Sequence, residues 1–351
     1  MSRIRKAIKK LFEDNEHVTF FPTYGYRQGA DWTIPLRIWV HEPRRVVEAA
    51  ANLLADNVGI SNERELENFK SRFADIIADS ESRERVVFIF DNDPEDEEWC
   101  VQWEDGSFPK SDLNGIIKGF IKLSHERAIS LIEAQSAQNG WLTIRAVSDE
   151  HSGLGRIRLI HAEGLSVISD IDDTLKVTEI PAGGKIVVRN TFLGDFTVAP
   201  EMIDSYKALG LACFHYVSGA PWQLYRPLSE FIEKEEFPEG SFHMKNVPTN
   251  LISPATWRDL LKLTGDATVE QKLSQIATIM SRFPGRKFIL VGDSGEHDPE
   301  IYRQLQDRFG DQVQEIWIRD VVNARHTTPG RLNGMKIIAA RTVLEGISGV
   351  S

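Results

Sequence analysis

The sequence predicts an α/β protein with a parallel sheet in its second half and a β-rich domain in its first half. After residue 164, strand-like apolar runs alternate with helical stretches, and short crossovers of this kind give a parallel sheet covered on both faces. Before residue 163, strand-like runs follow one another directly, which is typical of an antiparallel sandwich or barrel. We therefore expect two domains, at residues 1–163 and 164–351.

The first domain is expected to carry a helical insertion at about residues 44–78, where apolar residues recur at helical spacing. Residues 1–12 combine basic with apolar side chains and predict a basic amphipathic helix. Such a helix either contacts an anionic membrane surface or packs on its own domain. Strands are expected at 32–40, 85–91, 99–103, 115–123, 141–147 and 156–162, and residues 18–21 form a further apolar segment.

The second domain is expected to alternate strands with helices, apart from a glycine-rich, helix-poor stretch at 176–195. The expected strands are 165–169, 212–217, 241–245, 287–291 and 313–318. The expected helices are 200–209, 222–235, 268–282 and 299–309.

Composition excludes several classes of function. The net charge of −11 over 351 residues argues against a general nucleic-acid binder. Cys100 and Cys213 are the only cysteines, so neither a disulfide framework nor a zinc site is expected, and a cytoplasmic location is the default. The sequence has no apolar run of the roughly 18 residues that a transmembrane segment needs.

Polar side chains follow the strands of the second half at the points where those strands end. Asp170 and Asp172 are two residues apart and would face one ligand. Ser218 and the pair Asp293/Asp298 follow later strands, and the carboxyl ends of parallel strands meet at one edge. With Lys272 these residues form a phosphoryl-transfer set, in which a divalent metal and a cation offset the repulsion between a carboxylate and a phosphate.

These motifs resemble those of the haloacid dehalogenase (HAD) superfamily of phosphatases, in the same order. A closer resemblance is to the actin-patch-type phosphatidate phosphatases, relatives of the lipins, which hydrolyse phosphatidate to diacylglycerol with Mg²⁺. The phrases that carry it are Ile168–Thr174, Val217–Trp222, Gly292–Tyr302 and Trp317–Asp320. The resemblance implies a HAD-like, Rossmann-type sheet, an aspartyl-phosphate intermediate and a phospholipid substrate.

Carried over to this sequence, the resemblance implies a role for each residue. Asp170 would be the nucleophile and Asp172 the general acid and base, with a raised pKa. Ser218 would bind a phosphoryl oxygen from a helix N-terminus, and Thr174 would shape the turn. Lys272 would neutralise charge, a role for which Lys245 also competes. The implied Mg²⁺ ligands are Asp170, Asp172 through its main-chain carbonyl, Asp293 and Asp298.

The short gaps between these motifs leave little or no room for a cap domain, so we expect an open site that suits a bulky substrate. Two alternatives remain. One keeps the mechanism but acts on a phosphoprotein or a soluble phosphomonoester, and the other is a lipid-binding module without turnover. The presence of both Asp170 and Asp172 speaks against the second alternative, because a binding module needs neither a nucleophile nor an acid.

Overall fold

The computed structural model describes residues 16–42, 59–76, 78–148, 151–246 and 266–340. The chain divides into two compact units. The first spans residues 1–49 and 74–160, and the second spans 50–73 and 161–351. The predicted helix at residues 1–12 and the first helix of the predicted insertion lie outside the described residues.

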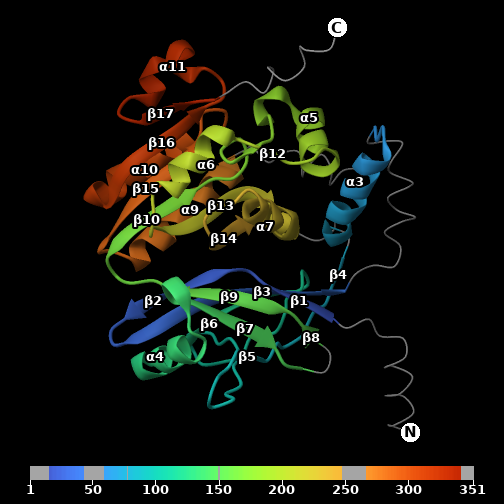
Figure 1. Cartoon of the computed structure of the whole chain (residues 1–351), viewed down its shortest axis with the longest axis vertical. Coiled ribbons are helices and arrows are strands. Elements are labelled where there is room, and N and C mark those ends of the chain that lie inside the picture. The colour runs from blue at the N-terminus through green and yellow to red at the C-terminus, as the bar shows by residue number, and fades with distance from the viewer. Residues whose placement is uncertain (1–15, 43–58, 77, 149–150, 247–265, 341–351) are drawn as a thin grey trace. The chain divides into compact units, whose positions relative to one another are not determined.

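The first unit is built on a 9-stranded sheet formed by described strands (Figure 1). Strand β3 is long and pairs antiparallel with four others, including β6 over eight register positions. As predicted, most pairs are antiparallel, but β1 pairs with β8 and β2 with β9 in parallel. The strands are β1 (Glu16–Phe20), β2 (Thr23–Gln28), β3 (Asp31–Glu42), β4 (Asp79–Ser80), β5 (Phe88–Phe90), β6 (Ile116–Leu123), β7 (Trp141–Ala146), β8 (His151–Ser152) and β9 (Leu154–Leu159).

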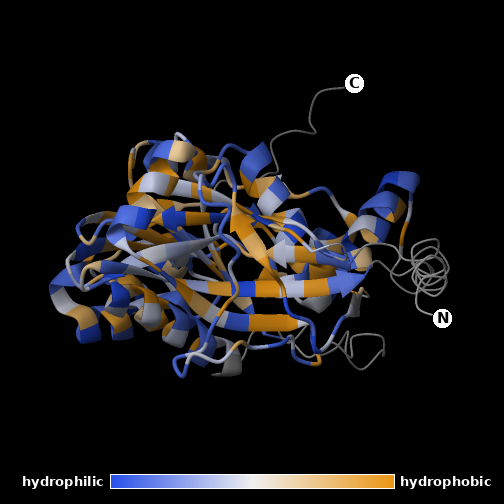
Figure 2. Cartoon of the chain, turned by 90° about the horizontal axis from the view of Figure 1, so that it is seen from below, coloured by the Kyte–Doolittle hydropathy of each residue, from blue (hydrophilic) through white to orange (hydrophobic). Residues whose placement is uncertain are grey.

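The core of this unit follows from alternation along the strands. In β3, Ile34, Leu36, Ile38 and Val40 are all buried and lie two residues apart, so they face the same side of the sheet. Figure 2 shows hydrophobic and hydrophilic residues alternating along strands of this kind. Helix α4 (His125–Ala134) begins at Ser124, whose side chain accepts the backbone N–H of Arg127.

The second unit holds a six-stranded sheet in the order β14-β13-β10-β15-β16-β17, and every pair in it is parallel. This confirms the predicted parallel α/β sheet. Its central strand β10 lies between β13 and β15, and a separate two-stranded ribbon, β11 with β12, follows β10 in the chain. The strands are β10 (Gly164–Ser169), β11 (Lys176–Val177), β12 (Thr197–Val198), β13 (Cys213–Pro221), β14 (Gly240–Lys245), β15 (Arg286–Asp293), β16 (Val313–Asp320) and β17 (Lys336–Ala339).

Helices cover this sheet, with α9 packed against β13 and β14 and α10 against β15 and β16. The helices are α5 (Gly184–Val188), α6 (Pro200–Lys207), α7 (Tyr225–Lys234), α9 (Asp266–Arg282), α10 (Asp298–Phe309) and α11 (Ala324–Thr327). Among the helices that the structure describes, none is long and apolar enough to cross a bilayer.

Helix α3 (Glu63–Ile76) groups mainly with the second unit, although it precedes most of the first unit in the sequence. One face of α3 holds the segment 189–195. Arg64 pairs with Asp195, and Asn68 donates to the carbonyl oxygen of Leu193. Arg72 donates to the carbonyl oxygens of Thr191 and Gly194. This arrangement differs from the predicted insertion of both helices into the first domain.

Candidate active site

The site begins where the central strand β10 ends. The apolar run of this strand is buried between two parallel neighbours, and Asp170 follows it directly, its N–H bonded to the carbonyl oxygen of Val291. The chain then turns sharply, because Asp173 adopts a left-handed φ of 53° and its carboxylate accepts the backbone N–H groups of residues 178–180. This turn fixes Asp170 and Asp172 at the carboxyl edge of the sheet.

Lys272, on α9, lies at the centre of a buried carboxylate group. Its Nζ is 2.9 Å from Asp170 Oδ1, 2.8 Å from Glu296 Oε2 and 2.9 Å from Asp298 Oδ1. Lys245, the other candidate, donates instead to Thr268 Oγ1 at 2.7 Å and is only partly buried. The structure therefore places Lys272, and not Lys245, beside Asp170.

The loop after β15 supplies the other acids. Asp293 Oδ1 accepts the backbone N–H groups of Gly295 at 2.6 Å and Glu296 at 3.0 Å. Asp298 is the first residue of α10 and is fully buried, and its Oδ2 accepts the N–H of Asp293. These bonds fold the loop back so that both aspartates lie near Asp170.

Asp172 has a different set of partners. Its Oδ1 lies 2.9 Å from Lys176 Nζ and accepts a hydrogen bond of 2.7 Å from Thr178 Oγ1. Among the residues that the structure describes, its Oδ2 contacts only Ser218 Oγ, at the longer distance of 3.4 Å. The two oxygens of this carboxylate are therefore inequivalent.

Each of the two leading aspartates is contacted by one hydroxyl group, Asp170 by Thr174 and Asp172 by Ser218. Thr174 Oγ1 donates to Asp170 Oδ2 at 3.1 Å, and both groups are buried. Ser218 lies inside strand β13, with its Oγ accepting the N–H of Ala220. The expected position of Ser218 at a helix N-terminus is wrong, because the strand continues to Pro221 and α7 begins only at Tyr225.

The pKa values of the two leading aspartates, Asp170 and Asp172, are shifted in opposite directions. Burial raises the pKa of Asp170 well above its usual value, and the carboxylates of Asp298 and Glu296 raise it further against the opposing effect of Lys272. Burial also raises the pKa of Asp293, with Asp298 and Glu296 adding to the rise. For Asp172 burial acts in the same direction, but Lys176 and Thr178 outweigh it, so its pKa is lowered. The raised pKa expected for Asp172 is thus not found in this structure.

The carboxylate group fits a divalent cation. Oxygens of Asp170, Asp293, Glu296 and Asp298 all lie within 4.8 Å of one another. Asp293 Oδ2 is buried and accepts no hydrogen bond from any described residue, whereas the buried Asp170 Oδ1 is paired with Lys272. A hard cation such as Mg²⁺ prefers oxygen ligands of this kind. The carboxylate of Asp172 is not part of this group, and its expected contribution through the main-chain carbonyl stays a prediction.

The residues of the site are closed off from solvent within the described part of the chain. Asp170 is 2% exposed, Lys272 3% and Asp172 9%. A pocket of about 690 Å³ lies next to the turn, with Asp173, Pro181, Asn190 and Arg319 in its wall, but Asp170 does not line it. This burial counts against the expectation of an open site.

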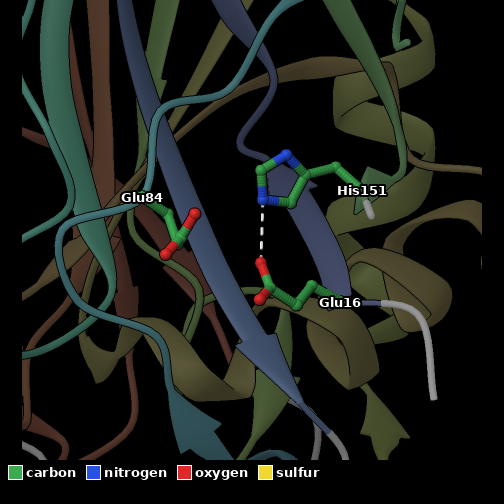
Figure 3. A group of neighbouring side chains, drawn as sticks. All are labelled: Glu16, Glu84 and His151. Atoms are coloured by element: carbon green, nitrogen blue, oxygen red, sulfur yellow. Dashed lines mark hydrogen bonds and ion pairs between the residues drawn. The ribbon is translucent and has the colours of Figure 1, made fainter. Parts of the chain in front are cut away.

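A second group of potential ligands lies in the first unit, where Glu16, Glu84 and His151 come within 4.8 Å of one another. Figure 3 shows His151 Nε2 directed at Glu16, a contact of 2.8 Å. Glu16 and His151 are register partners in the pairing of β1 with β8. The contact therefore fastens these two strands together.

The structure brings together most of the residues selected from the sequence and adds three that sequence reasoning left unassigned. One small volume is surrounded by five of the predicted residues, namely Asp170, Thr174, Lys272, Asp293 and Asp298. Beside it, Asp172 and Ser218 contact each other. Glu296, Lys176 and Thr178 are the additions. Glu296 stands within the motif Gly292–Asp298, so its acidic side chain was a usable signal, whereas Lys176 and Thr178 follow the turn without a recognisable motif.

A parallel α/β sheet with a buried group of carboxylates and a lysine at its carboxyl edge is an arrangement suited to phosphoryl transfer. Residues 165–320 match the family model described as "Phosphatidate phosphatase APP1, catalytic domain". The match confirms, for this segment, the resemblance to the actin-patch-type phosphatidate phosphatases.

Two curated relatives align with the same part of the chain. Phosphatidate phosphatase APP1 of Saccharomyces cerevisiae is 36% identical over 173 residues, which cover 47% of this chain and 27% of the yeast protein. An uncharacterized protein of Schizosaccharomyces pombe is 31% identical over 178 residues, which cover 48% of this chain and 27% of that protein. The alignments thus span about a quarter of the length of each relative.

Proposed function

We propose that this protein is a Mg²⁺-dependent phosphatase of the HAD type that hydrolyses phosphatidate to diacylglycerol and phosphate. The observation that carries the proposal is the buried group in which Lys272 lies 2.9 Å from both Asp170 and Asp298. It lies within the segment that matches the phosphatidate phosphatase family. A lysine and four clustered carboxylates suit the transfer of a phosphoryl group, because that reaction needs both a nucleophile and compensation of negative charge.

In the first step a carboxylate oxygen of Asp170 attacks phosphorus and the bond from phosphorus to the lipid oxygen breaks. The departing oxygen takes a proton from Asp172, so the products are an aspartyl phosphate and the alcohol diacylglycerol. Because Lys176 and Thr178 lower the pKa of Asp172, this step requires that the negative charge of the bound phosphate raise that pKa again. Thr174, which donates to Asp170 Oδ2, leaves Oδ1 as the attacking oxygen. Lys272 neutralises the charge that accumulates as the two anions approach.

In the second step water attacks the phosphorus of the aspartyl phosphate. Asp172, now ionised, takes a proton from that water while the bond between phosphorus and Asp170 breaks. Inorganic phosphate leaves, and Asp170 returns as a carboxylate and Asp172 as an acid. The short distance between Asp172 and Ser218, 3.4 Å, leaves Ser218 able to orient a phosphoryl oxygen at the same place.

Asp170, Asp293, Glu296 and Asp298 would hold the Mg²⁺ ion. When bound, the ion would neutralise phosphoryl oxygens and keep the surrounding carboxylates ionised. Asp293 Oδ2, which accepts no hydrogen bond from a described residue, has free acceptor capacity for the ion. Asp172 would contribute through its main-chain carbonyl.

Phosphatidate is favoured as substrate because the yeast relative is named as a phosphatidate phosphatase. A lipid substrate requires access to a bilayer surface, and residues 1–12 are the expected peripheral contact on the cytoplasmic side. A soluble phosphomonoester or a phosphoprotein keeps the same chemistry with a different leaving group, and the measurement below separates these substrates.

The test is Mg²⁺-dependent phosphate release from phosphatidate in detergent micelles and from a soluble aryl phosphate. Asp170→Asn is nearly isosteric but cannot form the acyl phosphate, so we expect its turnover to fall by about 10⁴-fold or more with the fold retained. Asp307→Asn, an exposed position on α10, is the matched control and should keep wild-type activity.

The outcomes separate the parts of the proposal. Release from phosphatidate in preference supports the lipid substrate, whereas release from the aryl phosphate alone keeps the mechanism and discards the lipid. Full activity in Asp170→Asn, or no release from either substrate by the wild type, overturns the proposed function and leaves a lipid-binding module.

A further inference from the structure

Lys176 is a fully buried cation for which the proposed reaction has so far no use. It stands at the start of β11, is 1% exposed, and its Nζ lies 2.9 Å from Asp172 Oδ1. The same ammonium donates to Thr178 Oγ1 at 2.5 Å, and Thr178 Oγ1 in turn donates to Asp172 Oδ1 at 2.7 Å. Three groups thus close a compact hydrogen-bonded triangle around one oxygen of Asp172.

The geometry points to Lys176 as a positioning residue that holds Asp172 Oδ1, so that Oδ2 is the oxygen that gives and takes the proton. This inference rests on the proposed function. Oδ2 remains available for proton transfer, since its only contact among the described residues is with Ser218 Oγ, at 3.4 Å. A carboxylic acid with one oxygen fixed can present the other in a constant direction, which is what proton transfer requires.

Lys176 also makes a cation–π contact with an aromatic ring. Its Nζ lies 4.9 Å from the centre of the Phe196 ring, within the range of a cation–π contact. The guanidinium of Arg72 lies 3.9 Å from the centre of the same ring. Arg72 also donates to the carbonyl oxygens of Thr191 and Gly194, just before Phe196 in the chain.

The support for Asp172 therefore extends beyond residues 165–320, the segment that matches the catalytic-domain family. Arg72 belongs to α3, which the chain supplies before most of the first unit. The sequence of contacts runs from Arg72 through Phe196 and Lys176 to Asp172. Each member of this series is a position where a substitution should disturb the orientation of Asp172, more weakly with distance.

The dependence of the rate on the leaving group distinguishes a positioning role of Lys176 from a purely structural one. As the bond from phosphorus to the leaving oxygen breaks, its electron pair stays on that oxygen, and an alkoxide or phenolate then needs the proton of Asp172. A para-nitrophenolate is stable without that proton. A misplaced Asp172 should therefore slow phenyl phosphate much more than para-nitrophenyl phosphate, whereas general loss of structure slows both equally.

The experiment compares kcat/KM, which reports the steps up to departure of the leaving group, for phenyl phosphate and para-nitrophenyl phosphate in the full chain with Mg²⁺. For Lys176→Met we expect the ratio of kcat/KM for phenyl phosphate to kcat/KM for para-nitrophenyl phosphate to fall by about 100-fold, the usual size of a lost acid–base contribution. Lys176→Arg keeps the charge and should restore the ratio to within about tenfold of wild type. Lys207→Met removes an exposed lysine–glutamate pair of the same unit and should leave the ratio unchanged.

Equal losses for both substrates in Lys176→Met, or no rescue by Lys176→Arg, would overturn the inference. Should Lys176→Met fail to fold, Thr178→Val and Arg72→Met decide the matter, because each must lower the same ratio by a smaller factor. Failure of the proposed function is recognised separately, since the wild type would then release no phosphate from either substrate, and this inference would fall with it.

Discussion

At the scale of single residues, Gly292 shows how tightly the acidic loop is packed. A Cβ atom built on Gly292 would lie 2.2 Å from Asp298 Oδ2 and 2.7 Å from its Cβ and Cγ. Asp298 is fully buried and bonded to Lys272, so its carboxylate has no room to retreat. A residue without a side chain is therefore required next to Asp293.

Gly292→Ala should lower the free energy of unfolding by about 1–3 kcal/mol, the usual cost of overpacking, and should reduce phosphatase activity by displacing Asp298 from Lys272. Denaturant unfolding monitored by circular dichroism measures the first effect. Gly330→Ala is the control, because a Cβ there meets nothing within 4 Å. Equal free energies of unfolding for Gly292→Ala and wild type would contradict the prediction, because the loop would then accommodate the added methyl group without cost.

The sequence predicted the identity of the acids better than their partners. Asp170, Asp293 and Asp298 could be selected because they end strands at one edge of a parallel sheet. The choice between Lys272 and Lys245 could not be made, since it depends on where α9 directs its side chains. The lowered pKa of Asp172 was equally out of reach, because it comes from the contact with Lys176.

At the scale of elements, helix α4 is joined to the acidic loop after β5 by a buried ion pair. Arg127 bonds both oxygens of Asp93, and neither side chain is more than 10% exposed. Burial alone would raise the pKa of Asp93, but the bonds from Arg127 and from the N–H groups of Glu95 and Glu97 outweigh it and lower the pKa. The pair therefore depends on an ionised Asp93.

Asp93→Asn should lower the free energy of unfolding at neutral pH by about 1–3 kcal/mol, because charged hydrogen bonds are lost. Since the folded pKa is lowered, the stabilisation is full above the pKa of an unfolded aspartate, about 3.9, and is lost as the pH falls through the lower folded value. The gap between variant and wild type should therefore close in acid. A gap that persists at low pH would contradict this, and Asp96→Asn, which is exposed, serves as control.

Elements with strong periodicity were predicted closely, and those set by tertiary contacts were not. Strands β10 and β15 and helices α9 and α10 lie within two residues of their predicted bounds. The expected strand at 99–103 is reduced to isolated bridges at Trp99 and Gln102. Strand β2 and helix α4 went unpredicted, and the stretch at 176–195, expected to be poor in helix, contains α5.

At the scale of the whole molecule, the two units should respond differently to Mg²⁺. The buried carboxylate group lies entirely in the second unit. A ligand that binds only the folded state stabilises by about 2.7 kcal/mol at a hundred times its dissociation constant. Saturating Mg²⁺ should therefore increase hydrogen-exchange protection in β10 and β15 and leave β3 and β6 unchanged, and chelation should reverse the effect.

Asp293→Asn should weaken this response, because it removes one carboxylate with free acceptor capacity. Equal gains in protection in both units would contradict the location of the metal site. The domain bounds 1–163 and 164–351 stay a prediction, and in the structure the two compact units meet in the sequence after residue 160. Helix α3 groups mainly with the second unit because its contacts are with residues far along the chain, which sequence continuity does not indicate.

The path of the chain through α3 has a consequence for synthesis of the protein. Arg72 and its partner Thr191 are separated by 119 positions, and translation at about 5–20 residues per second puts on the order of ten seconds between their emergence. During that interval the segment 189–195, which α3 contacts in the finished protein, has not yet been made. The second unit therefore cannot complete its contacts with α3 until the intervening residues of the first unit have been synthesised.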